Sequence, residues 1–175
     1  MENKKRNILI SEEQIQERIK ELGAKISSDY KGKNLYVLSL LRGSFIYTAD
    51  LVRHITVPTK IGFMTTSSYG NGETTSGNVK VVNDIPDDIT DYDVLIVDDI
   101  VDTGITMEFV LNHVKSLGAK DVKSCVLLDK PERRKVDLQP DYCCFEIPDV
   151  FVVGYGLNYG DYYRNIPYVF NWEEN

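Results

Sequence analysis

Three carboxylates, two threonines and a glycine lie within nine residues of one another, between positions 98 and 106. Asp98 and Asp99 come first, followed by Asp102 and by the run Thr103-Gly104-Ile105-Thr106. Threonine hydroxyls, and the backbone amides that a glycine leaves accessible, are suited to binding phosphate. Carboxylates repel phosphate but bind sugar hydroxyls or a divalent cation, so the segment is interpreted as a site for a phosphorylated sugar.

Regular secondary structure is expected on both sides of this acidic segment. Residues 94–97 are all apolar, and three of them are β-branched, which predicts a strand buried on both faces of a parallel sheet. The N-terminus of a following helix would offer unpaired amides to a phosphate. Gly118 stands where a left-handed residue would end that helix. Its apolar face would comprise Met107, Val110, Leu111, Val114 and Leu117.

A purely structural interpretation of the same residues is also available. A buried strand followed by a capped helix would leave the three acids lining a solvated loop. Taken alone, Asp102 is as good a helix N-cap as it is a catalytic group. The concentration of suitable side chains in so short a segment nevertheless favours a ligand site.

The rest of the chain predicts alternating strands and helices. Ser11 and Gln14 fit a capping box, which predicts a helix over about 11–30. An apolar strand over 35–41 is followed by a helix over about 45–55, whereas the tail from 159 has no regular period. Further strands are expected at 57–66, 79–82, 122–128, 142–146 and 151–155. This order predicts a single α/β domain over residues 1–175, with its ligand site beyond the carboxyl ends of a mainly parallel sheet.

Composition and charge argue against several classes of protein. The net charge of −7 disfavours a nucleic-acid partner. No apolar run is long enough to span a bilayer, and the N-terminus lacks the hydrophobic region of a secretory signal. The spacing of Cys125, Cys143 and Cys144 suits neither a disulfide framework nor a metal site. We therefore expect a protein of the reducing cytoplasm that binds no membrane.

Residues 67–77 are nearly all small or polar. Asn71-Gly72 is a strong turn signal, so an ordinary hairpin connection explains the segment as well as a mobile lid does. The charged run 131–135 is interpreted as a solvated turn.

Five separated motifs resemble the type I phosphoribosyltransferases, and among them the hypoxanthine-guanine phosphoribosyltransferases. They are Leu41-Arg42-Gly43, Ser68-Tyr69, the 98–106 segment, Leu128-Asp129-Lys130-Pro131 and the run 151–156. The resemblance implies purine salvage, in which hypoxanthine or guanine and phosphoribosyl pyrophosphate (PRPP) give IMP or GMP and pyrophosphate with Mg²⁺. It also implies the type I fold, a small hood formed by the terminal segments, and a homodimer or homotetramer.

For PRPP, the resemblance implies that Asp98 and Asp99 contact the ribose hydroxyls, directly or through Mg²⁺-bound water. Asp102 would be the general acid/base for the purine imidazole ring. The 5′-phosphate would bind Thr103, Gly104, Ile105 and Thr106. Relatives usually have Glu-Asp where this chain has Asp98-Asp99, and Ile105 stands where they often have a basic or polar residue.

For the purine, the resemblance assigns Lys130 to the 6-oxo group, Phe151 to stacking and Val152 to a backbone contact with the base edge. A solvated lysine and simple core packing would explain these residues without it. Pyrophosphate would bind Arg42, Gly43 and Arg164.

The resemblance also favours a lid that carries Ser68 and Tyr69. Asn158 replaces an aspartate that helps relatives to bind a second Mg²⁺, so weaker metal binding or an altered base preference is expected. Three other functions stay open: transfer to xanthine or another base, PRPP sensing by a nucleic-acid-binding regulator, and nucleotide binding without catalysis.

Overall fold

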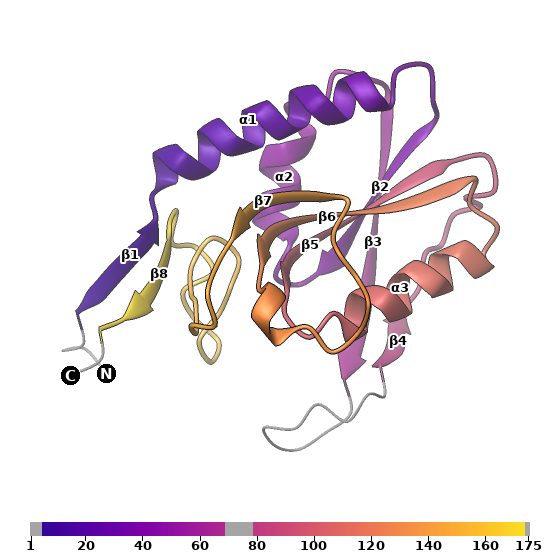
Figure 1. Ribbon diagram of the computed structural model, residues 1–175. Helices are drawn as coiled ribbons and strands as arrows, with labels where there is room; N and C mark the ends of the chain where they lie inside the picture. The colour runs from indigo at the N-terminus through magenta and orange to yellow at the C-terminus, as the bar shows by residue number, and fades with distance from the viewer. Residues whose placement is uncertain (1–4, 69–78, 174–175) are drawn as a thin grey trace.

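A six-stranded sheet lies at the centre of the structure, a computed structural model that describes residues 5–68 and 79–173 (Figure 1). Its strand order is β4-β3-β2-β5-β6-β7, and only the β3–β4 pair is antiparallel. The strands are β2 (Leu35–Leu41), β3 (Thr59–Ser68), β4 (Val79–Asn83), β5 (Asp93–Val101), β6 (Asp121–Asp129) and β7 (Tyr142–Glu146). The prediction of a mainly parallel α/β sheet is confirmed.

Helices cover both faces of this sheet, as a parallel sheet requires. One face packs against α1 (Glu12–Asp29) and α2 (Phe45–Val52), and the other against α3 (Ile105–Ser116). The predicted capping box is present at α1, where Ser11 and Gln14 exchange side-chain and backbone hydrogen bonds. Gly118 has a φ of 89° after the end of α3, so the predicted left-handed residue is also present.

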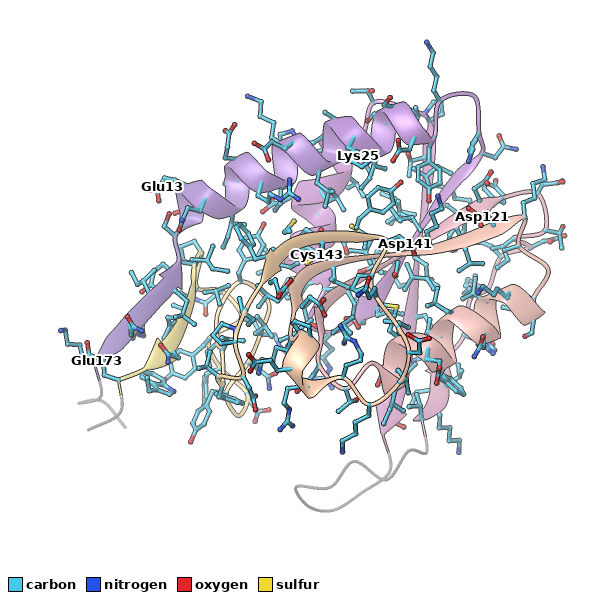
Figure 2. All side chains as sticks on the ribbon, viewed as in Figure 1. Glu13, Lys25, Asp121, Asp141, Cys143 and Glu173 are labelled. Atoms are coloured by element: carbon cyan, nitrogen blue, oxygen red, sulfur yellow. The ribbon has the colours of Figure 1, made fainter. Side chains whose placement is uncertain are left out.

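The two ends of the described chain form a separate antiparallel sheet, the hood. It pairs β1 (Arg6–Ile10) with β8 (Val169–Trp172) beside the central sheet (Figure 1). Lys5 Nζ lies 3.1 Å from the carboxylate of Glu173, which Figure 2 labels at this end of the molecule. The sequence analysis predicted no β1 and expected an irregular tail, so for β8 the expectation was wrong.

Several bounds also differ from the prediction: α2 ends at Val52 and not at 55, and β3 covers Thr59–Ser68 and not 57–66. Strand β5 continues through Asp98 and Asp99 to Val101, whereas the apolar run alone had suggested an end at residue 97. The strand expected at 151–155 is replaced by an isolated bridge between Val153 and Phe170. Between Leu128 and Lys130, the chain leaves β6 and enters a short 3₁₀ helix, η1 (Pro131–Arg133). In the described part of the chain, no helix is long and apolar enough to cross a membrane.

Candidate active site

The predicted residues Arg42, Asp98–Thr106 and Lys130 lie at or just beyond the carboxyl ends of β2, β5 and β6. These strands are parallel neighbours, with Val101 of β5 opposite Asp129 of β6. Arg42 follows β2 through a cis Leu41–Arg42 peptide, and Lys130 follows β6. The Lys130 amide donates to the Val101 carbonyl at 2.9 Å, which ties the β6 end to the acidic segment. These residues therefore lie at the edge of the sheet where the sequence predicted a ligand site.

The segment between β5 and α3 encloses a cavity of about 140 Å³. One water occupies roughly 30 Å³ in the liquid, so the cavity has room for a group larger than one water. Its polar lining includes Asp98, Asp102, Thr103, Gly104 and Thr106. The structure therefore brings four of the predicted phosphosugar residues together with Asp102 at the start of α3, where unpaired amides favour an anion.

Position 104 requires a glycine for two reasons: its backbone conformation and its close packing. Its φ is +84°, a left-handed conformation that other residues adopt at a cost. A Cβ at this position would lie 2.8 Å from side-chain atoms of Arg134 and Val136. The turn predicted to bind phosphate is therefore packed directly against the segment that follows η1.

Asp98 and Asp99 form a partly buried carboxylate pair. Burial raises the pKa of Asp98 well above its ordinary value, and the neighbouring Asp99 raises it further. Burial also raises the pKa of Asp99, although hydrogen bonds and the charge of Arg164 oppose the shift. A cation or a set of hydroxyl donors would relieve the repulsion between the two groups, so the pair suits the ligands proposed from the sequence.

Asp99 also lies against the second half of the site. A Cβ on Gly43 would fall 1.8 Å from an Asp99 carboxylate oxygen, and a Cβ on Gly156 would fall 2.1 Å from the Gly43 carbonyl oxygen. Arg164 Nη1 donates to the Gly156 carbonyl at 2.7 Å. The predicted pyrophosphate residues Arg42, Gly43 and Arg164 therefore gather on the Asp99 side of the site.

Asp102 does not cap the helix. The N-cap residue of α3 is Gly104, without a side-chain hydrogen bond, so the N-cap interpretation of Asp102 was wrong. The Asp102 carboxylate instead accepts a hydrogen bond of 3.0 Å from Arg133 Nε. Arg134 Nη1 donates to the Asp102 carbonyl at 2.8 Å, and its side chain is 12% exposed. The interpretation of 131–135 as a solvated turn was therefore wrong for Arg134, whereas Arg133 and Lys135 are exposed.

The three predicted purine residues differ strongly in exposure. Lys130 is buried, with 6% of its surface exposed, so the solvated-lysine alternative was wrong. Phe151 is 59% exposed and meets the ring of Tyr159 edge-on at a centroid distance of 6.0 Å. Val152 is buried at 5% exposure, so packing accounts for its side chain and only its backbone is available to a base. The exposed ring of Phe151 is available to stack on a flat ligand, and the buried Lys130 forms an ion pair with Asp149 at 3.9 Å.

Tyr155 fixes the chain between the purine and pyrophosphate regions. It has a φ of 49°, between Gly154 and Gly156, which also have positive φ. Its side chain is 2% exposed, and its hydroxyl donates to the Asp50 carboxylate on α2. This bond holds the Gly156 carbonyl where Arg164 can reach it.

Tyr155→Phe is expected to lower the free energy of unfolding by about 1 kcal/mol, because one buried hydrogen bond is lost. For PRPP, the substrate that the sequence predicts, the Michaelis constant should also rise, since Gly156 and Arg164 lose an anchor. Tyr142→Phe is the matched control, because its hydroxyl donates to Asp29 at 2.7 Å on the side of α1. Denaturant unfolding should show similar losses in both variants. An unchanged Michaelis constant in Tyr155→Phe would contradict the anchoring role.

Two predicted features are only partly described. Ser68 ends β3 opposite Val79, and Tyr69 lies outside the described residues, so the lid stays a prediction. Asn158 is exposed, and its side-chain nitrogen donates to the Gly160 carbonyl. The amide oxygen of Asn158 is therefore the atom of that side chain that is available to coordinate a cation.

The sequence analysis missed two charged residues that contact the site. Arg133 pairs with Asp102, and Asp149 pairs with both Arg133 and Lys130. Their types alone do not distinguish them from other surface charges. The only usable signal was their position, because each lies within three residues of a motif that had already been identified.

The site by itself offers few metal ligands. Within residues 5–68 and 79–173, no cluster of three or more His, Cys, Asp and Glu side chains is arranged to hold a metal. Mg²⁺ commonly binds one or two carboxylates together with substrate phosphates and waters. Asp98 and Asp99, with their unfavourable mutual charge, fit that mode of binding.

Comparison with known proteins agrees with this geometry. The family model described as the phosphoribosyl transferase domain matches residues 10–160. The chain is 48% identical over 166 residues to the hypoxanthine phosphoribosyltransferase of Haemophilus influenzae, covering 93% of each chain. It is 43% identical over 162 residues to the hypoxanthine-guanine phosphoribosyltransferase of Bacillus subtilis, covering 93% of this chain and 90% of the relative.

A solved structure gives the same result. The crystal structure of a hypoxanthine phosphoribosyltransferase from Staphylococcus aureus matches with a TM-score of 0.94 at 40% identity. The match covers 99% of this chain and 94% of the other.

Proposed function

Because the chain belongs to the phosphoribosyltransferase family, we propose that it transfers the 5-phosphoribosyl group of PRPP to hypoxanthine or guanine. The products are IMP or GMP and pyrophosphate, so the protein is a glycosyltransferase of purine salvage. The observation that carries the proposal is the cavity formed by Asp98, Asp102, Thr103, Gly104 and Thr106 at the N-terminus of α3. The presence of Asp102, the proposed acid/base, in the lining of this cavity favours an enzyme over a regulator or a non-catalytic binding protein.

The phosphosugar is bound by two kinds of group. The amides of Thr103, Gly104, Ile105 and Thr106, with the threonine hydroxyls, bind the 5′-phosphate. Asp98 and Asp99 bind the ribose hydroxyls, and Arg42, Gly43 and Arg164 bind the pyrophosphate. Bond breaking runs ahead of bond making, so positive charge develops on the ribose and the nearby acids stabilise it.

The purine is held by its face and by its edge. Phe151 stacks on the ring, the Val152 backbone meets the base edge, and the Lys130 ammonium donates to the 6-oxo group. Adenine has an amino group at that position and offers the ammonium no comparable acceptor. Asp102 exchanges a proton with the imidazole ring as the new bond forms.

Asp98 and Asp99 would hold Mg²⁺ together with the substrate. The metal would neutralise the pyrophosphate charge and leave the protein to orient the sugar. Asn158 contributes at most a neutral oxygen to a second cation. The lid that includes Ser68 and Tyr69 closes over the ribose and excludes water.

We further propose that the chain acts as one domain in the reducing cytoplasm and assembles as a homodimer or homotetramer. One observation supports a single domain, and another supports the reducing cytoplasm. The hood joins β1 to β8 from opposite ends of the described chain, and the three cysteines are free. The PRPP, purine and nucleotide partners follow from the reaction, which requires neither nucleic acid nor a membrane.

An ultraviolet assay of hypoxanthine, guanine, xanthine and adenine with PRPP and Mg²⁺ tests the function. Rapid turnover of hypoxanthine or guanine with slow turnover of adenine is expected. Preferred use of xanthine would leave the scaffold assignment intact and change the substrate. Failure to release pyrophosphate with any purine would overturn the proposal.

Asn158→Asp is expected to lower the Mg²⁺ concentration needed for half-maximal activity, because a carboxylate binds a cation more strongly than an amide does. Magnesium titrations of the wild type and the variant, with the four purines in turn, measure the effect and any change in base preference. Indistinguishable profiles would remove Asn158 from the metal site.

A further inference from the structure

A series of four alternating charges crosses the purine side of the site. Arg133 Nε lies 3.0 Å from an Asp102 carboxylate oxygen, and Arg133 Nη1 lies 3.6 Å from an Asp149 oxygen. The other Asp149 oxygen lies 3.9 Å from Lys130 Nζ. Asp102, Arg133, Asp149 and Lys130 therefore form a continuous chain of ion pairs, which we call the charge bridge.

Each member of the charge bridge comes from a different segment. Asp102 follows β5, Lys130 follows β6, Arg133 ends η1, and Asp149 lies beyond β7. Backbone hydrogen bonds fix these segments, from Lys130 to Val101 and from Ile147 to Asp129, at 2.9 and 2.8 Å. The bridge thus spans three adjacent strand ends of the sheet.

The two ends of the bridge are the proposed acid/base and the proposed purine-binding cation. Asp102 and Lys130 must contact the same edge of the purine, because its 6-oxo group and its imidazole ring are adjacent. A carboxylate and an ammonium that contact the same small ligand would attract each other, and a direct pair would occupy both. In the structure each is instead paired with a member of the bridge: Asp102 with Arg133, and Lys130 with Asp149.

We propose that Arg133 is a positioning residue for the transfer reaction. It orients the Asp102 carboxylate toward the imidazole side of the purine, while Lys130 is paired with Asp149 and not with Asp102. This inference rests on the proposed function and adds a residue that contacts neither the sugar nor the base. A guanidinium suits this position because its planar fork donates in two directions at once.

Exposure limits the size of the effect. The side chains of Arg133, Asp102 and Asp149 are 46%, 41% and 47% exposed, so water competes for each ion pair. Arg133→Ala is therefore expected to lower kcat by about tenfold and not to abolish it. The Michaelis constant for PRPP should change less than about twofold, because Arg133→Ala leaves the backbone amides and threonine hydroxyls of residues 103–106 in place.

The experiment compares steady-state kinetics of the wild type, Arg133→Ala and Arg133→Lys, with Lys135→Ala as the control. Arg133→Lys should recover activity to within about threefold of the wild type, because it keeps the charge but loses the fork. Lys135 is an exposed cation two residues away in the same segment. If only local positive charge mattered, Lys135→Ala would lose as much activity as Arg133→Ala, and that result would overturn the proposal.

A double-mutant cycle with Asp102→Asn distinguishes a loss of kcat that acts through Asp102 from a nonspecific loss of activity. If Arg133 acts through Asp102, adding Arg133→Ala to Asp102→Asn should lower the residual kcat by less than about twofold. A further tenfold loss in the double mutant would overturn the proposal, as would a wild-type kcat in Arg133→Ala alone. Both outcomes require an active wild-type enzyme. A wild type that transfers to no purine would instead refute the proposed function.

Discussion

Asp102→Asn is expected to lower kcat for hypoxanthine by about 10²- to 10⁴-fold, the usual contribution of a positioned general acid/base. The replacement keeps the size of the side chain and removes its ability to exchange a proton. The Asp102 side chain is 41% exposed, and its carbonyl, which Arg134 holds, is unaffected by the change. The substitution should therefore lower the rate of the chemical step and leave the stability of the fold unchanged.

Single-turnover measurements with saturating PRPP isolate that step. The affinity for PRPP, measured by equilibrium binding, should stay within about threefold of the wild type, because the phosphate amides are untouched. Thermal denaturation provides the folding control. Turnover equal to the wild type would remove Asp102 from the acid/base role, whatever the variant's stability.

Gly43→Ala is expected to lower activity by about 10²-fold, because it would displace both halves of the phosphosugar site at once. The added methyl group would lie 1.8 Å from an Asp99 oxygen, so either that carboxylate or the Arg42–Gly43 backbone must move. Overpacking of this kind costs about 1–3 kcal/mol of stability. Since Gly156 packs on the Gly43 carbonyl, the disturbance would also reach Arg164.

Gly32→Ala separates this clash from ordinary glycine strain. Gly32 has a φ of +78°, and no neighbouring atom of the described residues lies within 4 Å of the position that a methyl group would take. Its replacement therefore strains only the local backbone, and it should lose about 1–2 kcal/mol of stability with unchanged kcat and PRPP affinity. Denaturant unfolding and steady-state kinetics on both variants make the comparison. If both variants retained full activity, the close contact between Gly43 and Asp99 would have no functional importance.

The sheet and the phosphosugar segment could be predicted because their signals are local. Four apolar residues before Asp98 predicted a buried strand, and the helical spacing after Thr106 predicted α3. Phosphate binding by the start of a helix depends only on backbone amides that every such helix presents. The sequence therefore determined the main fold and the residues that line the cavity.

Residues that act through distant partners could not be predicted in the same way. The β1–β8 pairing joins segments more than 150 residues apart, and no local pattern in either segment specified it. For the same reason, the sequence could not show that Lys130 is buried or that Arg133 pairs with Asp102. The type of a charged residue does not say whether water or another charge will be its partner.

The sequence by itself determined where the elements lie and which residues between β5 and α3 can bind a phosphosugar. The tertiary structure decided which groups from separate strands come together, including the Gly43–Asp99 contact and the pairing of Asp149 with Lys130. The physical reason is that hydrophobic periodicity and amide geometry act over a few residues. Electrostatic and packing contacts instead depend on distances that exist only after the sheet has assembled.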